Sequence, residues 1–151
     1  MSDLCRMILD VDTGIDDAMA ILYALRRPGI RLEALTTTFG NTDVDTATEN
    51  TLRILELAGR EDVPVARGPG RSLLKPFRGG ATHVHGDNGL GDVELPESRG
   101  HAVDETAPDL IVRLARENPG EITLCPVGPI TNVALALAKA PRRRSSSRRS
   151  S

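Results

Sequence analysis

Short apolar runs alternate with helical apolar stripes along most of the chain. The runs at residues 6–11, 31–39, 63–66 and 122–127 are typical of buried strands, because strands of parallel sheets are apolar on both faces. Between them, apolar positions recur every three or four residues, the period of an amphipathic helix. The stripes are Ala18, Ile21, Leu22 and Leu25; Thr51, Ile54, Leu55 and Ala58; Ala107, Leu110, Ile111 and Leu114; and Ile130, Val133, Ala134, Leu137 and Ala138. This alternation predicts an α/β fold, a doubly wound, mostly parallel sheet with helices on both faces.

Helix-ending and helix-capping residues fit the same plan. Pro28 and Gly29 follow the first stripe, and Gly59 follows the second, as expected where helices stop. Asp43 stands where the second helix begins and is a predicted N-cap. Residues 67–105 show no period and are rich in Gly, Pro and charged side chains, so we expect a long loop there that is either functional or disordered.

The composition limits the function classes. The chain of 151 residues has two Phe, one Tyr and no Trp, so its core must consist of Leu, Ile, Val and Ala. It has no stretch near the roughly 18 apolar residues of a membrane span, and its N-terminus lacks the plan of a signal peptide. We therefore expect a soluble, cytoplasmic protein without a membrane partner. Cys5 and Cys125 fall in predicted buried strands and are interpreted as small apolar residues.

The composition changes abruptly after Ala140. Residues 141–151 hold five of the 19 basic residues and none of the 21 acidic ones, and we expect this Arg/Ser-rich tail to be disordered. The remaining, acidic part argues against nucleic-acid binding by the folded domain, although RNA binding by the tail is an open alternative. A frameshift is one hypothesis for the tail, because Arg outnumbers Lys 17 to 2, as GC-rich coding produces.

Four aspartates crowd the end of the first predicted strand, at Asp10, Asp12, Asp16 and Asp17. Carboxylates this close repel one another, and a fold usually compensates them with a cation, a donor-rich ligand or a helix N-terminus. The cluster could present several oxygens to one hard cation, either calcium, which prefers six to eight oxygen ligands, or magnesium, which takes fewer protein ligands in an octahedron. The alternative interpretation is that two aspartates cap the next helix and two are solvated. Gly40-Asn41 follows the second strand, and carboxyl ends of parallel strands share one sheet edge, so Asn41 and the aspartates are expected to meet.

The segment Asp-Val-Asp-Thr-Gly-Ile-Asp-Asp-Ala at 10–18 resembles the signature Asp-x-Asp-Pro-Gly-x-Asp-Asp-Ala of the inosine-uridine preferring nucleoside hydrolases. Thr36 to Asn41 is similar to the family's second strand, with its ribose-contacting Asn. Val84 to Gly91 resembles its His-Gly-x-x-Gly-Leu segment, and Cys125 to Asn132 its Gly-Pro-Leu-Thr-Asn turn. The likeness covers residues 5–140 in the expected order, and residues 1–140 are identified as the N-terminal portion of such a domain.

The resemblance implies hydrolysis of the N-glycosidic bond of ribonucleosides to free base and ribose, an activity of purine and pyrimidine salvage, with Ca²⁺ as the cofactor. Asp12 would bind calcium and activate a calcium-bound water as the base. Asp17 and the backbone carbonyl of Val127 would be further calcium ligands. Asp10 would orient these ligands from behind. Thr13 stands where the family has Pro, which should cost turn rigidity rather than ligands.

The resemblance also assigns the substrate contacts. Asp16 and Asn41 would hydrogen-bond ribose hydroxyls. His85 either approaches the nucleoside or is a solvated loop residue, whereas His83 and His101 are expected to be solvated. The implied partner is a small nucleoside, and the family's tendency to self-associate makes a homo-oligomer a candidate.

Two alternatives stay open at this point. Family members are about twice as long, and their second half supplies a further calcium-ligating Asp and the His linked to leaving-group protonation, so the chain could be an impaired calcium- or ribose-binding remnant. The second alternative is a haloacid-dehalogenase-like phosphatase with Asp10 as nucleophile, Asp12 as acid and magnesium as cofactor. That family's motif requires Thr at the position of Gly14 and has no need for Asp16 and Asp17.

Overall fold

The computed structural model describes residues 4–140. The tail at 141–151, with the predictions of disorder, frameshift and RNA binding made for it, lies outside the described residues. Four parallel strands form one sheet in the order β3-β2-β1-β4. The strands are β1 (Cys5–Val11), β2 (Ile30–Thr37), β3 (Val65–Arg67) and β4 (Ile122–Pro126).

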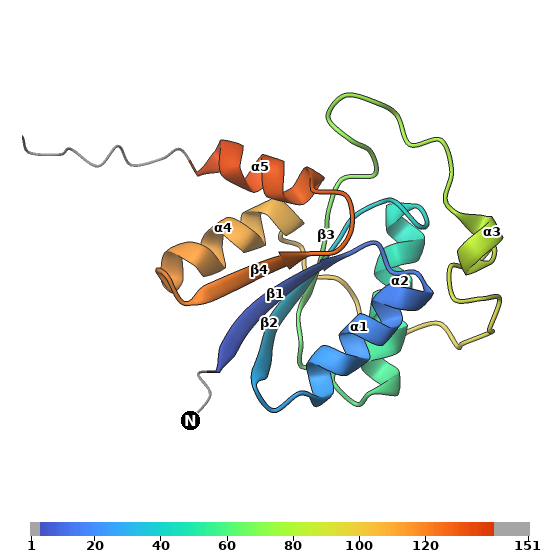
Figure 1. The fold of residues 1–151 in the computed structure, drawn as a ribbon, viewed down its shortest axis with the longest axis horizontal. Helices are drawn as coiled ribbons and strands as arrows, with labels where there is room; N and C mark the ends of the chain where they lie inside the picture. Colours follow the sequence, from blue (N-terminus) through green and yellow to red (C-terminus); the bar gives the residue numbers. More distant parts are fainter. Residues whose placement is uncertain (1–3, 141–151) are drawn as a thin grey trace, which may run out of the picture.

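Helices cover both faces of the sheet. The helices of residues 4–140 are α1 (Ile15–Arg26), α2 (Val44–Leu57), α3 (Thr82–His85), α4 (Ala107–Glu117) and α5 (Thr131–Lys139), and α3 lies in the loop after β3 rather than on the sheet. Helices α1 and α2 lie on one side, and α4 and α5 lie on the other (Figure 1). The predicted doubly wound α/β fold is therefore confirmed, and each predicted strand and helix is present with ends shifted by one or two residues.

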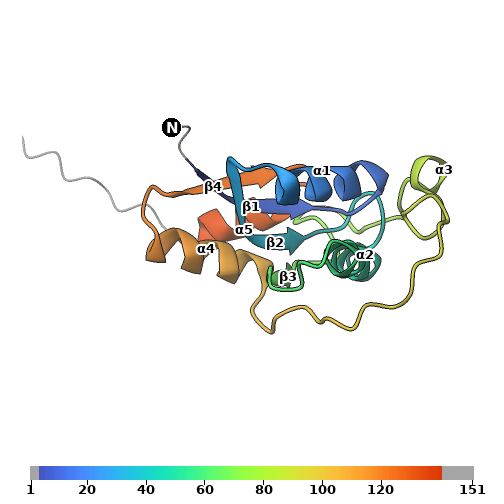
Figure 2. The ribbon, with the colours of Figure 1, turned by 90° about the horizontal axis from the view of Figure 1, so that it is seen from below.

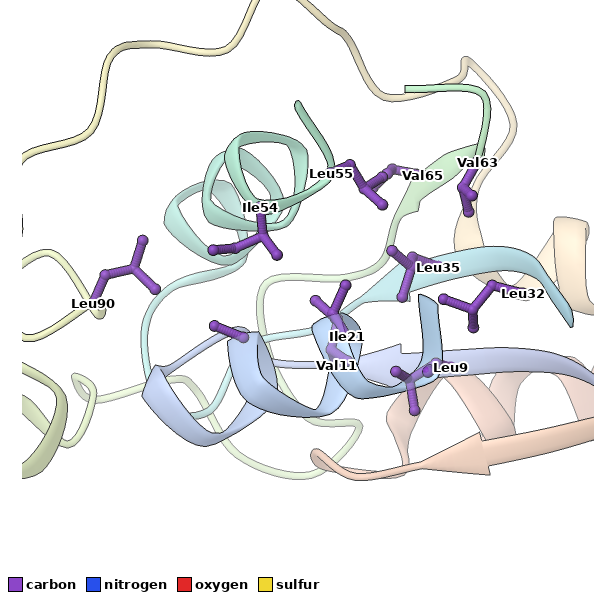
Figure 3. Packing of buried hydrophobic residues seen from close by; sticks show 12 residues of the cluster. Leu9, Val11, Ile21, Leu32, Leu35, Ile54, Leu55, Val63, Val65 and Leu90 are labelled. Carbon is purple, nitrogen blue, oxygen red and sulfur yellow. The ribbon is translucent and has the colours of Figure 1, made fainter. Parts of the chain in front are cut away.

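Two apolar clusters fill the space between sheet and helices. The larger one joins Leu9 and Val11 of β1 to Ile21 of α1 and Ile54 of α2 (Figure 3). The smaller one joins the other sheet face to α4 and α5 and includes the fully buried Ile8. Successive residues of β1 thus face opposite clusters, which explains why the strand reads as a continuous apolar run.

Asp43 caps α2 as the sequence predicts. Its Oδ1 accepts hydrogen bonds from the backbone N–H groups of Asp45 and Thr46, at 3.0 and 2.9 Å. Asp43→Ala is expected to lower the free energy of unfolding by about 1 kcal/mol, because two N–H groups of the first turn lose their acceptor. Urea denaturation measures this change. Asp45→Ala, in the same turn but without capping bonds, is the control, and equal losses in both variants would contradict the capping role.

The helix predicted from the apolar stripe at 130–138 is present as α5, but that stripe is not the buried face of the helix. Ile130 and Leu137 are 64% and 69% exposed, whereas Thr131 and Asn132 are buried. The helix is turned so that Asn132 can hydrogen-bond to the sheet, and this polar contact outweighs the apolar period. Cys125 is only half-buried, because β4 is an edge strand rather than a buried one.

The long segment after β3 is more ordered than its composition indicates. It contains α3 and then passes outside α2 and β3 (Figure 2). The backbone N–H of Ser98 donates to Glu49, and Arg99 pairs with Glu56 at 2.6 Å. The segment is therefore fixed to the outer side of α2. No helix within residues 4–140 combines the length and the apolar character needed to cross a membrane.

Candidate active site

Three carboxylates are buried where β1 ends and α1 begins. Asp10 lies within β1, Asp12 follows the strand, and Asp17 lies in the first turn of α1. Their exposed fractions are 0%, 5% and 3%. The alternative of solvated turn residues is therefore wrong for Asp10 and Asp12. Full burial of Asp10 also makes it unsuitable as the nucleophile of a phosphatase.

Asn41 connects the two carboxylates expected to bind metal. Its backbone N–H donates to Asp12 Oδ2 at 2.7 Å, and its side-chain Nδ2 donates to Asp17 Oδ2 at 2.9 Å. The turn after β2 therefore reaches the turn after β1, as the shared sheet edge predicts. The backbone N–H of Gly14 donates to the same Asp17 oxygen at 3.2 Å.

Two glycines let the backbone approach Asp12 from both sides. A Cβ on Gly40, whose φ is 154°, would collide with Asp12 Oδ2. A Cβ on Gly128 would lie 2.8 Å from Asp12 Oδ1. The turn that contains Val127 and Gly128 thus packs against this carboxylate. The N–H of Val127 donates to the Asp10 carbonyl at 2.9 Å, which fixes the start of that turn.

Asp10 anchors a buried network beneath the site. Its Oδ1 accepts from Thr36 Oγ1 of β2 at 2.6 Å and from Asn132 Nδ2 of α5 at 2.8 Å. The same Nδ2 donates to the Thr37 carbonyl at 2.9 Å. Asp10 therefore joins β1 to β2 and α5 beneath the turn of Asp12. Thr36 and Asn132 both lie in the sequence motifs described above, but nothing in those motifs indicates that they bind Asp10.

Burial dominates the electrostatics of the cluster. It raises the pKa of Asp10 to about 6 from 3.8, although the hydrogen bonds from Thr36 and Asn132 oppose the shift. Burial, followed by the charge of Asp12, raises the pKa of Asp17 to about 6. Burial also raises the pKa of Asp12. The ion pairs within residues 4–140 involve none of these three carboxylates.

These shifts predict that the metal-free chain loses stability as the pH rises. The folded state favours the protonated forms of Asp10 and Asp17, so their stabilisation is present below pH 3.8 and is lost as the pH passes about 6. The expected loss between about pH 4.5 and pH 7 is on the order of 2 kcal/mol per carboxylate. Urea denaturation in chelator measures it. Asp17→Asn should flatten the profile, whereas Asp104→Asn, an exposed control, should not. A wild-type profile that rises with pH would contradict the prediction.

Unpartnered polar atoms concentrate at this site. Within residues 4–140, five buried side-chain oxygens have no hydrogen-bond partner. They are Asp10 Oδ2, Asp17 Oδ1, Thr38 Oγ1, Asn50 Oδ1 and Asn132 Oδ1. Buried polar groups are normally paired, so such a concentration suits a site that binds a ligand or ion. No group of three or more His, Cys, Asp or Glu side chains within residues 4–140 is arranged to hold a metal.

His85 is buried rather than solvated, which corrects one of its two interpretations. It ends α3, and its Nδ1 accepts from the Ile15 N–H at 3.1 Å. The same nitrogen lies 3.9 Å from Oδ1 of Asp16, whose side chain is 79% exposed. The structure thus brings His85 and Asp16 together at the start of α1. His83 and His101 are exposed, as expected.

Asn50 of α2 holds the loop of His85 against the aspartate turn, and sequence reasoning missed it. Its Nδ2 donates to the Asn88 carbonyl at 2.8 Å and to the Thr13 carbonyl at 3.4 Å. The Thr13 hydroxyl is also hydrogen-bonded to the Thr51 hydroxyl at 2.7 Å. This bond offsets part of the turn rigidity that is lost because Thr13 replaces the family's proline. The one sequence feature that could have indicated this role is the position of an asparagine directly beside the apolar stripe of α2.

The fold and the site define an α/β protein with a buried carboxylate cluster at the carboxyl ends of its central strands. The family model described as inosine-uridine preferring nucleoside hydrolase matches residues 7–149, and the chain belongs to that family. Probable uridine nucleosidase 2 of Arabidopsis thaliana is 43% identical, over 93% of this chain and 44% of the relative. The inosine-uridine preferring nucleoside hydrolase of Leishmania major is 40% identical, over 91% and 44%.

Solved structures agree with this assignment. A plant nucleoside hydrolase matches with a TM-score of 0.87 and 45% identity, over 89% of this chain and 43% of the solved one. A purine-preferring ribonucleoside hydrolase from Gardnerella vaginalis matches with a TM-score of 0.87 and 41% identity, over 90% and 44%. The chain therefore spans less than half the length of the relatives it matches.

Proposed function

We propose that this chain acts in hydrolysis of the N-glycosidic bond of ribonucleosides, giving free base and ribose. The observation that supports this most directly is the buried pair Asp12 and Asp17, bridged by Asn41. None of the ion pairs formed within residues 4–140 involves either carboxylate. Such a buried pair of carboxylates needs a compensating cation, and hard oxygen ligands favour calcium. The unpartnered Asp17 Oδ1 is a free ligand atom for it.

The proposed calcium ligands are Asp12, Asp17 and the carbonyl of Val127, supported from behind by Asp10. Calcium, when bound, lowers the pKa of a coordinated water and holds sugar hydroxyls. Asp12 Oδ1 is the carboxylate oxygen that would take a proton from the attacking water, since Oδ2 already accepts from Asn41. In the proposed hydrolysis, the oxygen of that water would bond to the anomeric carbon as the carbon–nitrogen bond breaks. The base, which leaves with the bonding electrons, would take a proton from solvent, and Asp12 would return its proton to solvent.

Asp16, Asn41 and His85 are the proposed contacts to the nucleoside. Asp16 is exposed at the start of α1 and can accept from ribose hydroxyls. Asn41 keeps one amide hydrogen and its carbonyl oxygen beyond the bond to Asp17. His85 Nδ1 is occupied by the Ile15 N–H, so Nε2 is the nitrogen available to the substrate.

Ribose release from inosine and uridine tests this proposal. The purified full chain is assayed with calcium, with chelator, and after calcium is restored. Turnover that disappears on chelation and returns with calcium is the expected result. Phosphate release from p-nitrophenyl phosphate would instead support the phosphatase alternative.

A second candidate is a module that binds calcium and ribose without turnover. It is favoured by the chain's span of less than half its relatives and by the lack of a third metal-ligating side chain among residues 4–140. Calorimetric titration with calcium separates the two candidates. Calcium binding without ribose release favours the module, and absence of both rejects both candidates.

A further inference from the structure

One aromatic side chain anchors the segment that joins β3 to α3, drawn in green in Figure 1. Every residue from 71 to 80 is exposed except Ser72 and Phe77, which are half-buried. Leu73 and Leu74 are 62% and 92% exposed, although both are apolar. Phe77 is therefore the apolar side chain by which this part of the segment packs on the domain.

The partner of Phe77 is Phe39, which lies two residues before Asn41. The two ring centroids are 5.7 Å apart and the rings are tilted by 60°, an arrangement in which aromatic rings attract one another. Phe39 follows β2 and is 9% exposed, so its own position is fixed by the fold. The pair therefore joins the segment to the turn whose Asn41 binds both buried carboxylates.

The segment then crosses the backbone of Asn41. A Cβ on Gly80 would collide with the Asn41 carbonyl oxygen, so the two backbones are in direct contact. The N–H of Ala81 donates to the same carbonyl at 3.0 Å, and the carbonyl of Ala81 accepts from the His85 N–H at 3.0 Å. Ala81 therefore connects Asn41 to His85. Its place depends on the anchor at Phe77, four residues earlier.

We propose that Phe77 is a positioning residue that sets the places of Asn41 and His85. This inference rests on the proposed function, in which these two residues contact the nucleoside. Asp12 and Asp17 are held at the end of β1 and in α1, which do not belong to the path from Phe77. Substrate affinity should therefore depend on Phe77 much more than calcium affinity does.

Steady-state kinetics of the full chain with uridine and inosine test the proposal. Phe77→Ala should raise KM at least about fivefold and leave kcat within about twofold, because two contacts to the bound nucleoside lose their alignment. Phe77→Tyr keeps the ring and should restore KM. Gly80→Ala displaces the segment at the Asn41 carbonyl and should raise KM as Phe77→Ala does. Leu74→Ala shortens an exposed side chain of the same segment and is the matched control, with no expected effect.

Amide exchange gives a second measurement that needs no turnover. Phe77→Ala should speed the exchange of the Ala81 and His85 amides at least about tenfold and leave that of β1 unchanged. Unchanged exchange at these two amides overturns the proposal. Faster exchange in β1 as well marks a general loss of stability and also overturns it.

The kinetic outcomes separate this proposal from the proposed function. An active wild-type chain with unchanged KM in Phe77→Ala, an equal rise in Leu74→Ala, or no recovery in Phe77→Tyr overturns the role of Phe77. A wild-type chain that releases no ribose contradicts the proposed function instead. Amide exchange at Ala81 and His85 then decides whether Phe77 positions the two residues.

Discussion

Asp12→Asn is expected to stabilise the metal-free chain by about 1 kcal/mol and to weaken calcium binding at least about 100-fold. The carboxylate of Asp12 is 5% exposed, and its pKa is raised by burial. Asparagine removes the repulsion with Asp17, while its oxygen can still accept from the Asn41 N–H. The same change removes a charged ligand and the proposed base, so ribose release should fall to background.

Two measurements check these opposite effects. Urea denaturation in chelator gives the stability change, and calorimetric titration with calcium gives the change in affinity. Asp104→Asn removes an exposed carboxylate and should alter neither quantity. Calcium affinity equal to that of the wild type would remove Asp12 from the proposed ligand set.

Asn132→Leu is expected to destabilise the fold by about 3 kcal/mol. Asn132 is fully buried and donates both to Asp10 Oδ1 and to the Thr37 carbonyl. Leucine has a similar volume but donates no hydrogen bond, so the buried carboxylate keeps only its bond from Thr36. The cost arises mainly from the unpaired charge and not from lost packing.

A comparison on the same helix isolates this cause. Leu137→Asn, at a position 69% exposed, should change stability by no more than about 0.5 kcal/mol. In an Asp10→Asn background the cost of Asn132→Leu should be clearly smaller, because a neutral amide is cheaper to leave unpaired. Equal costs in both backgrounds would show that Asn132 acts through packing alone.

Most of the fold could be predicted from apolar periods. The strand at 6–11 and the stripe of Ile21 and Leu22 belong to elements that bury apolar side chains, and burial sets their pattern. Helix α5 breaks the rule, since Asn132 is drawn to Asp10 and carries Ile130 and Leu137 into exposure. The apolar period of a sequence reports only where apolar side chains recur. It contains no information on a hydrogen bond between a carboxylate and an amide that lie far apart in the chain.

The site could be predicted where neighbouring strand ends bring residues together. Asp12, Asp17 and Asn41 meet for that reason. The supporting residues depend on tertiary contacts without a local signal, as Asn50 shows. Its partners lie 37 and 38 residues away, on two different loops.

The amide of Asn50 couples two parts of the site that are far apart in sequence. It binds the turn of the aspartates and the loop of His85 at once, so neither can open without straining the other. The two segments should therefore exchange their backbone amides as one cooperative unit rather than independently. On the proposed function, entry of a nucleoside past His85 requires a concerted opening that also loosens the carboxylate cluster.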